Sequence, residues 1–211
     1  MDIIGERWAL FVIRELMFGP RRFSDLKAAL PGISANVLTQ RLEGLEEAGI
    51  VLRRKLPPPA SAQVYELTEW GYEAEPLFRV VGRWAARSPR LMPAPMSVNS
   101  VILSLRTMFS SERAAGIDLC LGLVLDGMEF CAEVADGQLV IGPGSLAGCE
   151  AVVSGDQNAL AGVIYGGASL AEMEAAGRLC ISGNDARVEQ FVQLFPLPER
   201  ASSGNCARQL G

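Results

Sequence analysis

The side chains that usually carry enzymatic chemistry are scarce in this chain. Its 211 residues include no histidine, which excludes Ser-His-Asp and Cys-His nucleophile pairs and histidine-ligated zinc or haem. A histidine-based pH switch is excluded as well. Carboxylates, two lysines and five cysteines remain as reactive groups. No motif places a nucleophile beside a base, so we expect a protein that is not an enzyme and uses no cofactor.

The cysteines have neither metal-site nor disulfide-framework spacing. No two of them form a CxxC pair, and they stand at positions 120, 131, 149, 180 and 206. We therefore expect reduced thiols that pack as small apolar groups, and no metal site. A thiol sensor that uses Cys120, Cys131 or Cys180 is a lesser alternative. Cys120 and Cys131 could face each other across a hairpin, since both stand close to an Asp126-Gly127 turn.

Charge divides the chain into two parts. Residues 1–92 hold 13 basic and 11 acidic side chains, whereas residues 93–211 hold 6 basic and 13 acidic ones. The first part is therefore +2 and the second −7, within a total of −5. The change coincides with the proline-rich run SPRLMPAPMS, which has the composition of a semi-rigid linker. We predict two domains, residues 1–88 and 98–196, with a linker at 89–97 and a flexible tail at 197–211.

Residues 1–92 have the element order of a winged helix-turn-helix. Apolar spacing predicts helices over 3–16, 23–30 and 34–48, the last capped by Ser34, then strands over 50–56 and 63–67. A final helix begins after Thr68, and Pro76 should kink or restart it. The third helix buries three leucines and leaves a polar face of the kind that reads base edges in the major groove. Arg53, Arg54 and Lys55 beside the hairpin loop are suited to phosphates.

The period changes to two after residue 118, which indicates strands. Leu119 to Leu125, residues 128–135 and residues 138–141 alternate apolar and polar positions, with Asp126-Gly127 and Asp136-Gly137 between them. Further strands are predicted over 150–154 and 178–182. Helices are predicted over 98–110 and 156–164, from Ser169 by a capping-box spacing, and from Asn184. The fold class is therefore α+β.

The first part resembles the HxlR-type bacterial transcriptional regulators over residues 3–88. The similarity lies in IGERWALFVIRELMFGPRRFSDL, ISANVLTQRLEGLEEAGIVLRRK and VYELTEWG, in that order. It implies a winged helix, mainly α with a β-hairpin wing, whose recognition helix spans 34–48 and whose wing spans 53–63. It also implies a homodimer that binds a palindromic operator in double-stranded DNA. The chain departs from the family in having no cysteine in this part, where several members sense oxidants or electrophiles.

Two sets of contact residues follow from the helical pattern and this resemblance. Short polar and basic side chains are the expected DNA contacts: Arg21, Arg22, Ser34, Asn36, Val37, Thr39, Gln40, Arg41, Arg53, Arg54, Lys55, Ser61 and Gln63. Apolar side chains of the first and last helices are the expected dimer contacts: Ile4, Trp8, Phe11, Leu77, Val81 and Trp84. The tryptophans, Trp70 included, are expected in a core or an interface rather than stacked on bases.

The second part resembles the sterol-carrier-protein (type 2) domains over residues 98–196. The similarity lies in CLGLVLDGMEFCAEVADGQLVIGPG, EAVVSGDQNALAGVIYG and GRLCISGNDARVEQFVQLFP. It implies a five-stranded, mostly antiparallel sheet with helices on one face that enclose an apolar tunnel for acyl chains or sterols. No motif fixes the tunnel residues. The pattern alone nominates apolar side chains of the inner sheet face and the helices: Met108, Leu121, Leu123, Phe130, Val134, Leu160, Ile164 and Phe191.

Together these patterns predict a cytoplasmic DNA-binding regulator. There is no signal-like start and no apolar run long enough to cross a bilayer, so no membrane partner is expected. In the leading hypothesis an apolar small molecule in the C-terminal domain modulates DNA binding. In the alternative the regulator is constitutive, and the C-terminal domain only dimerises or recruits a partner.

Overall fold

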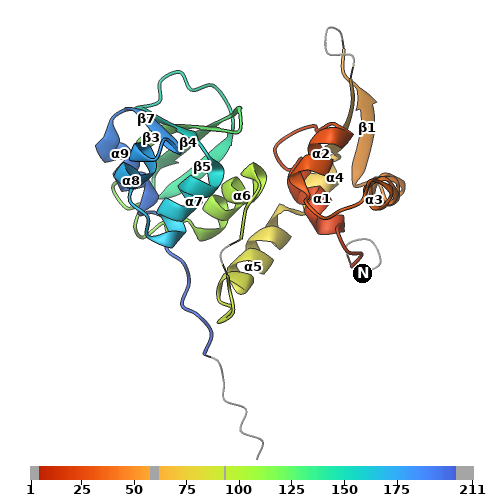
Figure 1. Cartoon of the computed structure of the whole chain (residues 1–211), viewed down its shortest axis with the longest axis horizontal. Helices are drawn as coiled ribbons and strands as arrows, with labels where there is room; N and C mark the ends of the chain where they lie inside the picture. The colour runs from red at the N-terminus through yellow and green to blue at the C-terminus, as the bar shows by residue number, and fades with distance from the viewer. Residues whose placement is uncertain (1–4, 58–61, 93, 203–211) are drawn as a thin grey trace, which may run out of the picture.

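The protein consists of an N-terminal helical region and a C-terminal sheet, with helix α6 between them (Figure 1). The computed structural model describes residues 5–57, 62–92 and 94–202. The mixture of helices and sheet confirms the predicted α+β class. Every helix among the described residues is too short or too polar to span a bilayer.

Three helices and a two-stranded ribbon form the first part of the N-terminal region. Helices α1 (Ala9–Leu16), α2 (Phe23–Ala29) and α3 (Ala35–Glu47) precede the antiparallel strands β1 (Val51–Lys55) and β2 (Gln63–Leu67). Their apolar faces bury a common cluster, which includes Ile13, Leu26 and the predicted α3 leucines Leu38, Leu42 and Leu45. This burial holds α3 against the rest of the region and leaves its polar face free.

Helix α1 is shorter than the sequence predicted. The expected helix over residues 3–16 begins only at Ala9, because Trp8 adopts a left-handed backbone conformation with φ 79°. A non-glycine residue in that conformation cannot continue a right-handed helix. The prediction was therefore wrong for residues 5–8, while residues 3 and 4 lie outside the described part of the chain.

Proline divides the predicted last helix of this region in two. Thr68 caps α4 (Glu69–Tyr72), its side-chain oxygen accepting a hydrogen bond from Gly71 N at 3.0 Å. Helix α5 (Glu75–Ala86) then starts with Pro76 in its first turn, where the missing N–H costs no helical hydrogen bond. The restart predicted at Pro76 is confirmed.

Five strands form the C-terminal sheet in the order β5-β4-β3-β6-β7. They are β3 (Leu119–Leu125), β4 (Met128–Ala135), β5 (Gln138–Pro143), β6 (Ala151–Gly155) and β7 (Leu179–Gly183). The β3–β6 pair is parallel and the other pairs are antiparallel. Asp126 and Asp136 have positive φ and each precedes a glycine that also has positive φ. This is the backbone of the two-residue hairpin turns that the Asp-Gly pairs predicted.

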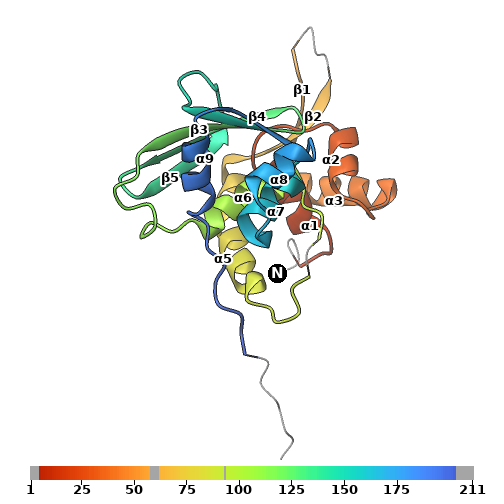
Figure 2. The ribbon, with the colours of Figure 1, turned by 60° about the vertical axis from the view of Figure 1, so that its left-hand side comes forward.

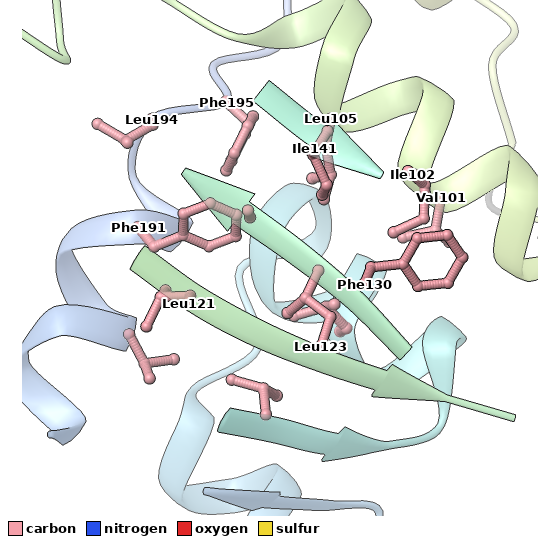
Figure 3. Close-up of a cluster of buried hydrophobic side chains, with 14 of the residues drawn as sticks. Val101, Ile102, Leu105, Leu121, Leu123, Phe130, Ile141, Phe191, Leu194 and Phe195 are labelled. Atoms are coloured by element: carbon pink, nitrogen blue, oxygen red, sulfur yellow. The ribbon is translucent and has the colours of Figure 1, made fainter. Parts of the chain in front are cut away.

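One face of this sheet is covered by helices. Helices α6 (Val98–Met108), α7 (Gln157–Gly166) and α9 (Asp185–Val192) bury side chains against it, and α8 (Leu170–Ala175) adds half-buried ones. Figure 3 shows Leu121, Leu123 and Phe130 of the sheet facing Val101, Ile102 and Leu105 of α6 and Phe191 of α9. The opposite face carries Cys120, Gly122 and Cys131, because side chains alternate along a strand.

A buried polar junction joins the two parts of the molecule. The Glu15 side chain at the end of α1 is only 1% exposed, pairs with Arg14 at 2.8 Å and accepts a hydrogen bond from Ser97 Oγ at 2.7 Å. Asn99, fully buried in the first turn of α6, donates to the Glu15 carbonyl at 2.8 Å. Its own Oδ1 accepts from Arg21 Nη2 at 3.1 Å. These contacts fix the end of α1 against the start of α6.

We predict that Asn99→Ala destabilises the protein by about 2 kcal/mol. The change leaves a buried carbonyl at the end of α1 and a donor on Arg21 without their hydrogen-bond partner. Asn36→Ala, the same change at an exposed position of α3, is the control and should alter stability by less than about 0.5 kcal/mol. Equilibrium urea unfolding measures both variants. Equal losses of stability would contradict the role given to the junction.

Candidate nucleic-acid interface

A tight turn sets the angle between α2 and α3. The turn passes through Pro31 and Gly32, and Gly32 has φ 91°, which an L side chain rarely adopts. Ser34 then caps α3, since its Oγ accepts a hydrogen bond from Val37 N at 3.2 Å. The predicted cap is confirmed, and it fixes the first turn of α3 at the point where the chain leaves the core.

The exposed face of α3 changes character along its length. Ser34, Asn36, Thr39 and Gln40 are exposed in the first two turns, and Val37 beside them is half-buried. The second half of the exposed face is acidic, with Glu43, Glu46 and Glu47. Only the first half therefore suits DNA, whose phosphates repel carboxylates. Figure 1 places α3 on the side of the molecule away from the C-terminal sheet.

Arg41 is held by the protein itself. Its Nη1 lies 2.8 Å from a carboxylate oxygen of Glu6, and its side chain is 18% exposed. Its Nε is buried without a hydrogen-bond partner among the described residues. The guanidinium is thus turned toward the segment before α1, which the helical pattern of α3 alone could not reveal.

The β1–β2 ribbon carries the basic side chains expected of the wing. Arg53 pairs with Tyr65 and Lys55 with Gln63 in the strand register, so these four side chains share one face. Arg53, Lys55 and Gln63 are exposed. Arg54, on the other face, forms an ion pair with Glu66, and this hydrogen bond raises the pKa of Arg54. Ser61 lies outside the described residues.

The two arginines before α2 have different surroundings. Arg22 is exposed, and its backbone N–H donates to Asp25 Oδ2 at 3.2 Å. The Arg21 side chain contacts Asn99 and also lies 2.9 Å from Met128 Sδ, so it is bound to the C-terminal part of the molecule. The prediction that Arg21 contacts DNA does not fit this position. Its partners lie far away in the sequence, where no local pattern pointed to them.

Helix α5 exposes a row of apolar side chains. No α5 residue is buried, and Val80 and Trp84 are 69% and 76% exposed. Leu77 and Val81 are exposed beside them, which places all four at helical spacing on one face. Val80 was not among the predicted contacts, although the same spacing would have included it. The opposite side of α5 lies against α6, where Arg83 donates to the Thr107 carbonyl at 3.3 Å.

The predicted dimer residues of α1 are less uniform. Phe11 is exposed, Trp8 is half-buried, and their rings lie 5.5 Å apart in a tilted pair. Arg14 covers the Phe11 ring, with its guanidinium carbon 5.0 Å from the ring centroid. Ile4 lies outside the described residues.

The residues predicted to bind an apolar ligand lie together in the C-terminal core. All but Ile164, which is half-buried, are at most 5% exposed: Met108, Leu121, Leu123, Phe130, Val134, Leu160 and Phe191. They fill the space between the sheet and the helices. A separate surface hollow of about 600 Å³ is lined by polar and small residues of the 111–118 segment and the β4–β5 turn, and contains none of them.

Comparisons with known proteins concern the N-terminal region. A family model described as HxlR-like helix-turn-helix matches residues 3–91. The uncharacterized HTH-type transcriptional regulator YvaP of Bacillus subtilis is 36% identical over 85 residues, which is 40% of this chain and 79% of YvaP. The HTH-type transcriptional regulator YodB of the same species is 37% identical over 84 residues, 40% of this chain and 75% of YodB.

A solved structure of YodB is among the similar proteins. The reduced form of YodB from B. subtilis is 35% identical, covers 42% of this chain and 87% of its own, and has a TM-score of 0.39. The matched residues contain the α2–α3 turn, the recognition-helix candidate and the β1–β2 wing. Because the chain is 36% identical to YvaP over 79% of that protein's length, it belongs to the HxlR-like helix-turn-helix family.

Proposed function

We propose that this helix-turn-helix transcriptional regulator binds a palindromic DNA operator as a homodimer, with α3 in the major groove. The observation that carries the proposal is the exposed, carboxylate-free first half of α3, flanked by the basic β1–β2 wing. Recognition helices of this motif contact base edges with their N-terminal residues. The side chains assigned to base edges are Asn36, Thr39 and Gln40.

The wing supplies contacts to the DNA backbone. Arg53 and Lys55 project from one face of the ribbon without an ion pair in the part of the chain that the structure describes, whereas Arg54 is paired with Glu66. Arg53 and Lys55 are therefore the assigned phosphate contacts, with Arg22 at the start of α2. Arg21 and Arg41 are left out of the assignment, because each is already bound within the protein.

The acidic C-terminal part does not oppose this mode of binding. The charge of −7 lies in residues 93–211, and α3 lies on the side of the molecule away from the C-terminal sheet (Figure 1). At physiological salt the Debye length is about 8 Å, so charges on the parts of the sheet that lie farther than this from α3 are screened from DNA bound there. The local charge at the wing governs the encounter with DNA.

We predict different effects from the two classes of DNA contact. Gln40→Ala should weaken specific binding about 5- to 100-fold and relax the preference at one base pair. Arg53→Ala should weaken all sequences about equally and reduce the slope of log K against log salt by about 1. Fluorescence anisotropy with a DNA library drawn from upstream regions measures both.

Arg200→Ala is the matched control for Arg53→Ala, because it removes the same charge from an exposed position whose neighbours Glu199 and Ala201 bind Arg87 at the end of α5. Its affinity and salt slope should equal those of the unaltered protein. If Arg53→Ala behaves like Arg200→Ala, the wing does not contact phosphates. Failure of the unaltered protein to select any sequence would refute the operator proposal itself.

The dimer proposal rests on the apolar row of α5. Leu77, Val80, Val81 and Trp84 expose contiguous apolar surface on a helix whose other side is packed on α6. Monomers rarely leave such surface open to water. We assign it to contact with a second copy, together with Phe11 and Trp8 of α1. A dimer is also what two half-sites about 34 Å apart require.

Val80→Glu should shift the protein from dimer to monomer and weaken operator binding by at least about 10-fold, since a buried carboxylate in the interface has no partner. Val140→Glu is the control, because Val140 on β5 is 70% exposed, nearly the same as Val80 at 69%. Sedimentation equilibrium measures the mass of both variants. A Val80→Glu protein that remains dimeric would place the interface elsewhere.

We further propose that the C-terminal domain, taken as residues 98–196, is sterol-carrier-like and receives an apolar small molecule. The support is the convergence of the predicted residues between the sheet and helices, and the partly exposed edge formed by α7 and α8. Leu170 and Met173 of α8 are only half-buried against the core. A Cβ at Gly162, Gly166 or Gly167 would meet no other atom within 4 Å. Entry of a ligand at this edge would disturb few contacts.

Binding of an apolar effector should change operator affinity, since a ligand acts through its different affinities for two states. The measurement is anisotropy of the operator complex with a panel of fatty acids and sterols, paired with thermal unfolding of the free protein. If a lipid stabilises the protein but leaves its DNA affinity unchanged, the domain binds the lipid without regulating DNA binding. No thermal shift with any lipid would favour the constitutive alternative, in which the domain only dimerises or recruits a partner.

A thiol-based redox sensor remains the lesser alternative. Burial raises the pKa of Cys120, Cys131 and Cys149, which lowers the fraction of reactive thiolate near neutral pH. Cys180 is exposed on β7 and stands apart from those three. The N-terminal region, which carries the DNA contacts, has no cysteine.

A further inference from the structure

Three cysteine thiols from separate segments meet on the outer face of the C-terminal sheet. Cys120 lies in β3, Cys131 in β4 and Cys149 in the segment between β5 and β6. The Sγ of Cys120 is 3.3 Å from that of Cys149 and 3.6 Å from that of Cys131, and the Cys131–Cys149 distance is 3.9 Å. All three thiols are half-buried.

The register of β3 and β4 brings the first two thiols together. Cys131 lies opposite Gly122, two residues from Cys120 on the same face, so Cys120 and Cys131 are diagonal neighbours. The two cysteines thus share a face of the hairpin as expected, but they are offset by two residues in the register instead of lying directly opposite each other. Cys149 was not expected there, because it comes from a loop.

The loop carrying Cys149 is fixed to β3 at a point without a side chain. A Cβ on Gly122 would lie 3.0 Å from the Leu146 side chain and 3.1 Å from that of Val152, so glycine at this position lets Leu146 pack closely on β3. Next to Cys149, Glu150 N donates to the Cys120 carbonyl at 2.8 Å, and Cys120 N donates to Glu150 Oε1 at 3.2 Å. The loop that carries Cys149 is therefore held to β3 by contacts that do not involve the sulfurs.

The sulfur spacing fits a shared metal ion. A zinc ion with Zn–S bonds of about 2.3 Å in tetrahedral geometry needs sulfurs about 3.8 Å apart. The three sulfur–sulfur distances in the protein, 3.3, 3.6 and 3.9 Å, are close to this value. A disulfide requires an S–S distance of about 2.05 Å and joins only two of the sulfurs. Thiolate sulfur selects thiophilic ions over magnesium or calcium.

A carboxylate lies near one of the three sulfurs, that of Cys131. Glu133 follows Cys131 by two residues on the same strand face and lies opposite Cys120 in the register. Its Oε1 is 4.0 Å from Cys131 Sγ. A carboxylate here favours a cation over an anion and offers a fourth ligand of a type that zinc accepts.

We propose that Cys120, Cys131 and Cys149 form a binding site for a thiophilic divalent ion of the zinc class, with Glu133 as the fourth ligand. The three thiols bind as thiolates and release their three protons to solvent, and the ion keeps its oxidation state. An ion at this place ties the 144–150 loop to β3 and β4. The site is independent of the DNA-binding function and is assayed without DNA.

The test uses the full chain with Cys180→Ser and Cys206→Ser, so that only the three site cysteines remain. Under a thiol-free reductant, this protein should take up one Cd²⁺ or Zn²⁺ per chain, with sulfur-to-cadmium charge-transfer absorption in the ultraviolet. Its affinity, measured against a chromophoric chelator, should equal that of the unaltered protein. Cys131→Ser in this background should weaken binding at least about 100-fold, and Glu133→Gln about 10-fold.

A second measurement needs no variant in the site. Bound Zn²⁺ should slow alkylation of all three thiols together, which mass spectrometry counts. Less than half an ion per chain, or an affinity unchanged by Cys131→Ser, would overturn the site. Uptake of monovalent copper alone would overturn the divalent assignment, and unchanged binding in Glu133→Gln would overturn the fourth ligand.

Discussion

A buried carboxylate determines how the two parts of this molecule fit together. Glu15 is withdrawn from water at the end of α1, and an unpaired charge there would cost several kcal/mol. Arg14 and Ser97 satisfy it, while Asn99 takes the neighbouring backbone carbonyl. Because hydrogen bonds need close and directed contact, this junction permits one placement of α6 on α1. Apolar packing alone would leave several.

Helix α6 contributes side chains to both hydrophobic clusters, the N-terminal one and the core under the sheet. Leu103 belongs to the N-terminal cluster, whereas Ile102 and Leu105 belong to the core under the sheet. Arg106 extends the same link, since it pairs with Glu75 at 2.6 Å and lies over the Phe18 ring at 4.9 Å. Phe18 in turn meets Phe130 of the sheet edge-to-face. Helix α6 thus lies between the sheet domain and the helices that pack against α3 (Figure 2).

Local physics explains what the sequence predicted well. Helix caps and hairpin turns depend on a few adjacent residues, so Ser34, Thr68 and the two Asp-Gly turns could be assigned from the chain alone. The exposed face of α3 followed from helical periodicity in the same way. The start of α1 could not be assigned, because the left-handed backbone of Trp8 interrupts an apolar pattern that looks helical.

Pairings between distant residues explain what was missed. Arg21 and Arg41 are of the residue type that contacts DNA. In the folded protein, however, Arg21 is hydrogen-bonded to Asn99 and Arg41 forms an ion pair with Glu6. The same holds for Cys149, which reaches Cys120 and Cys131 because its loop is hydrogen-bonded to β3 through Glu150. A one-dimensional pattern reports which side chains share a face, and it does not report which faces meet.

The position of Leu103 has a consequence for the order of events during synthesis. The N-terminal helices leave the ribosome first, and their hairpin and helical contacts are local enough to form early. Their apolar cluster nevertheless lacks Leu103 until the middle of α6 has emerged, and the last carbonyls of α1 lack Asn99. The nascent DNA-binding region thus reaches its final packing only when the first helix of the following domain docks on it.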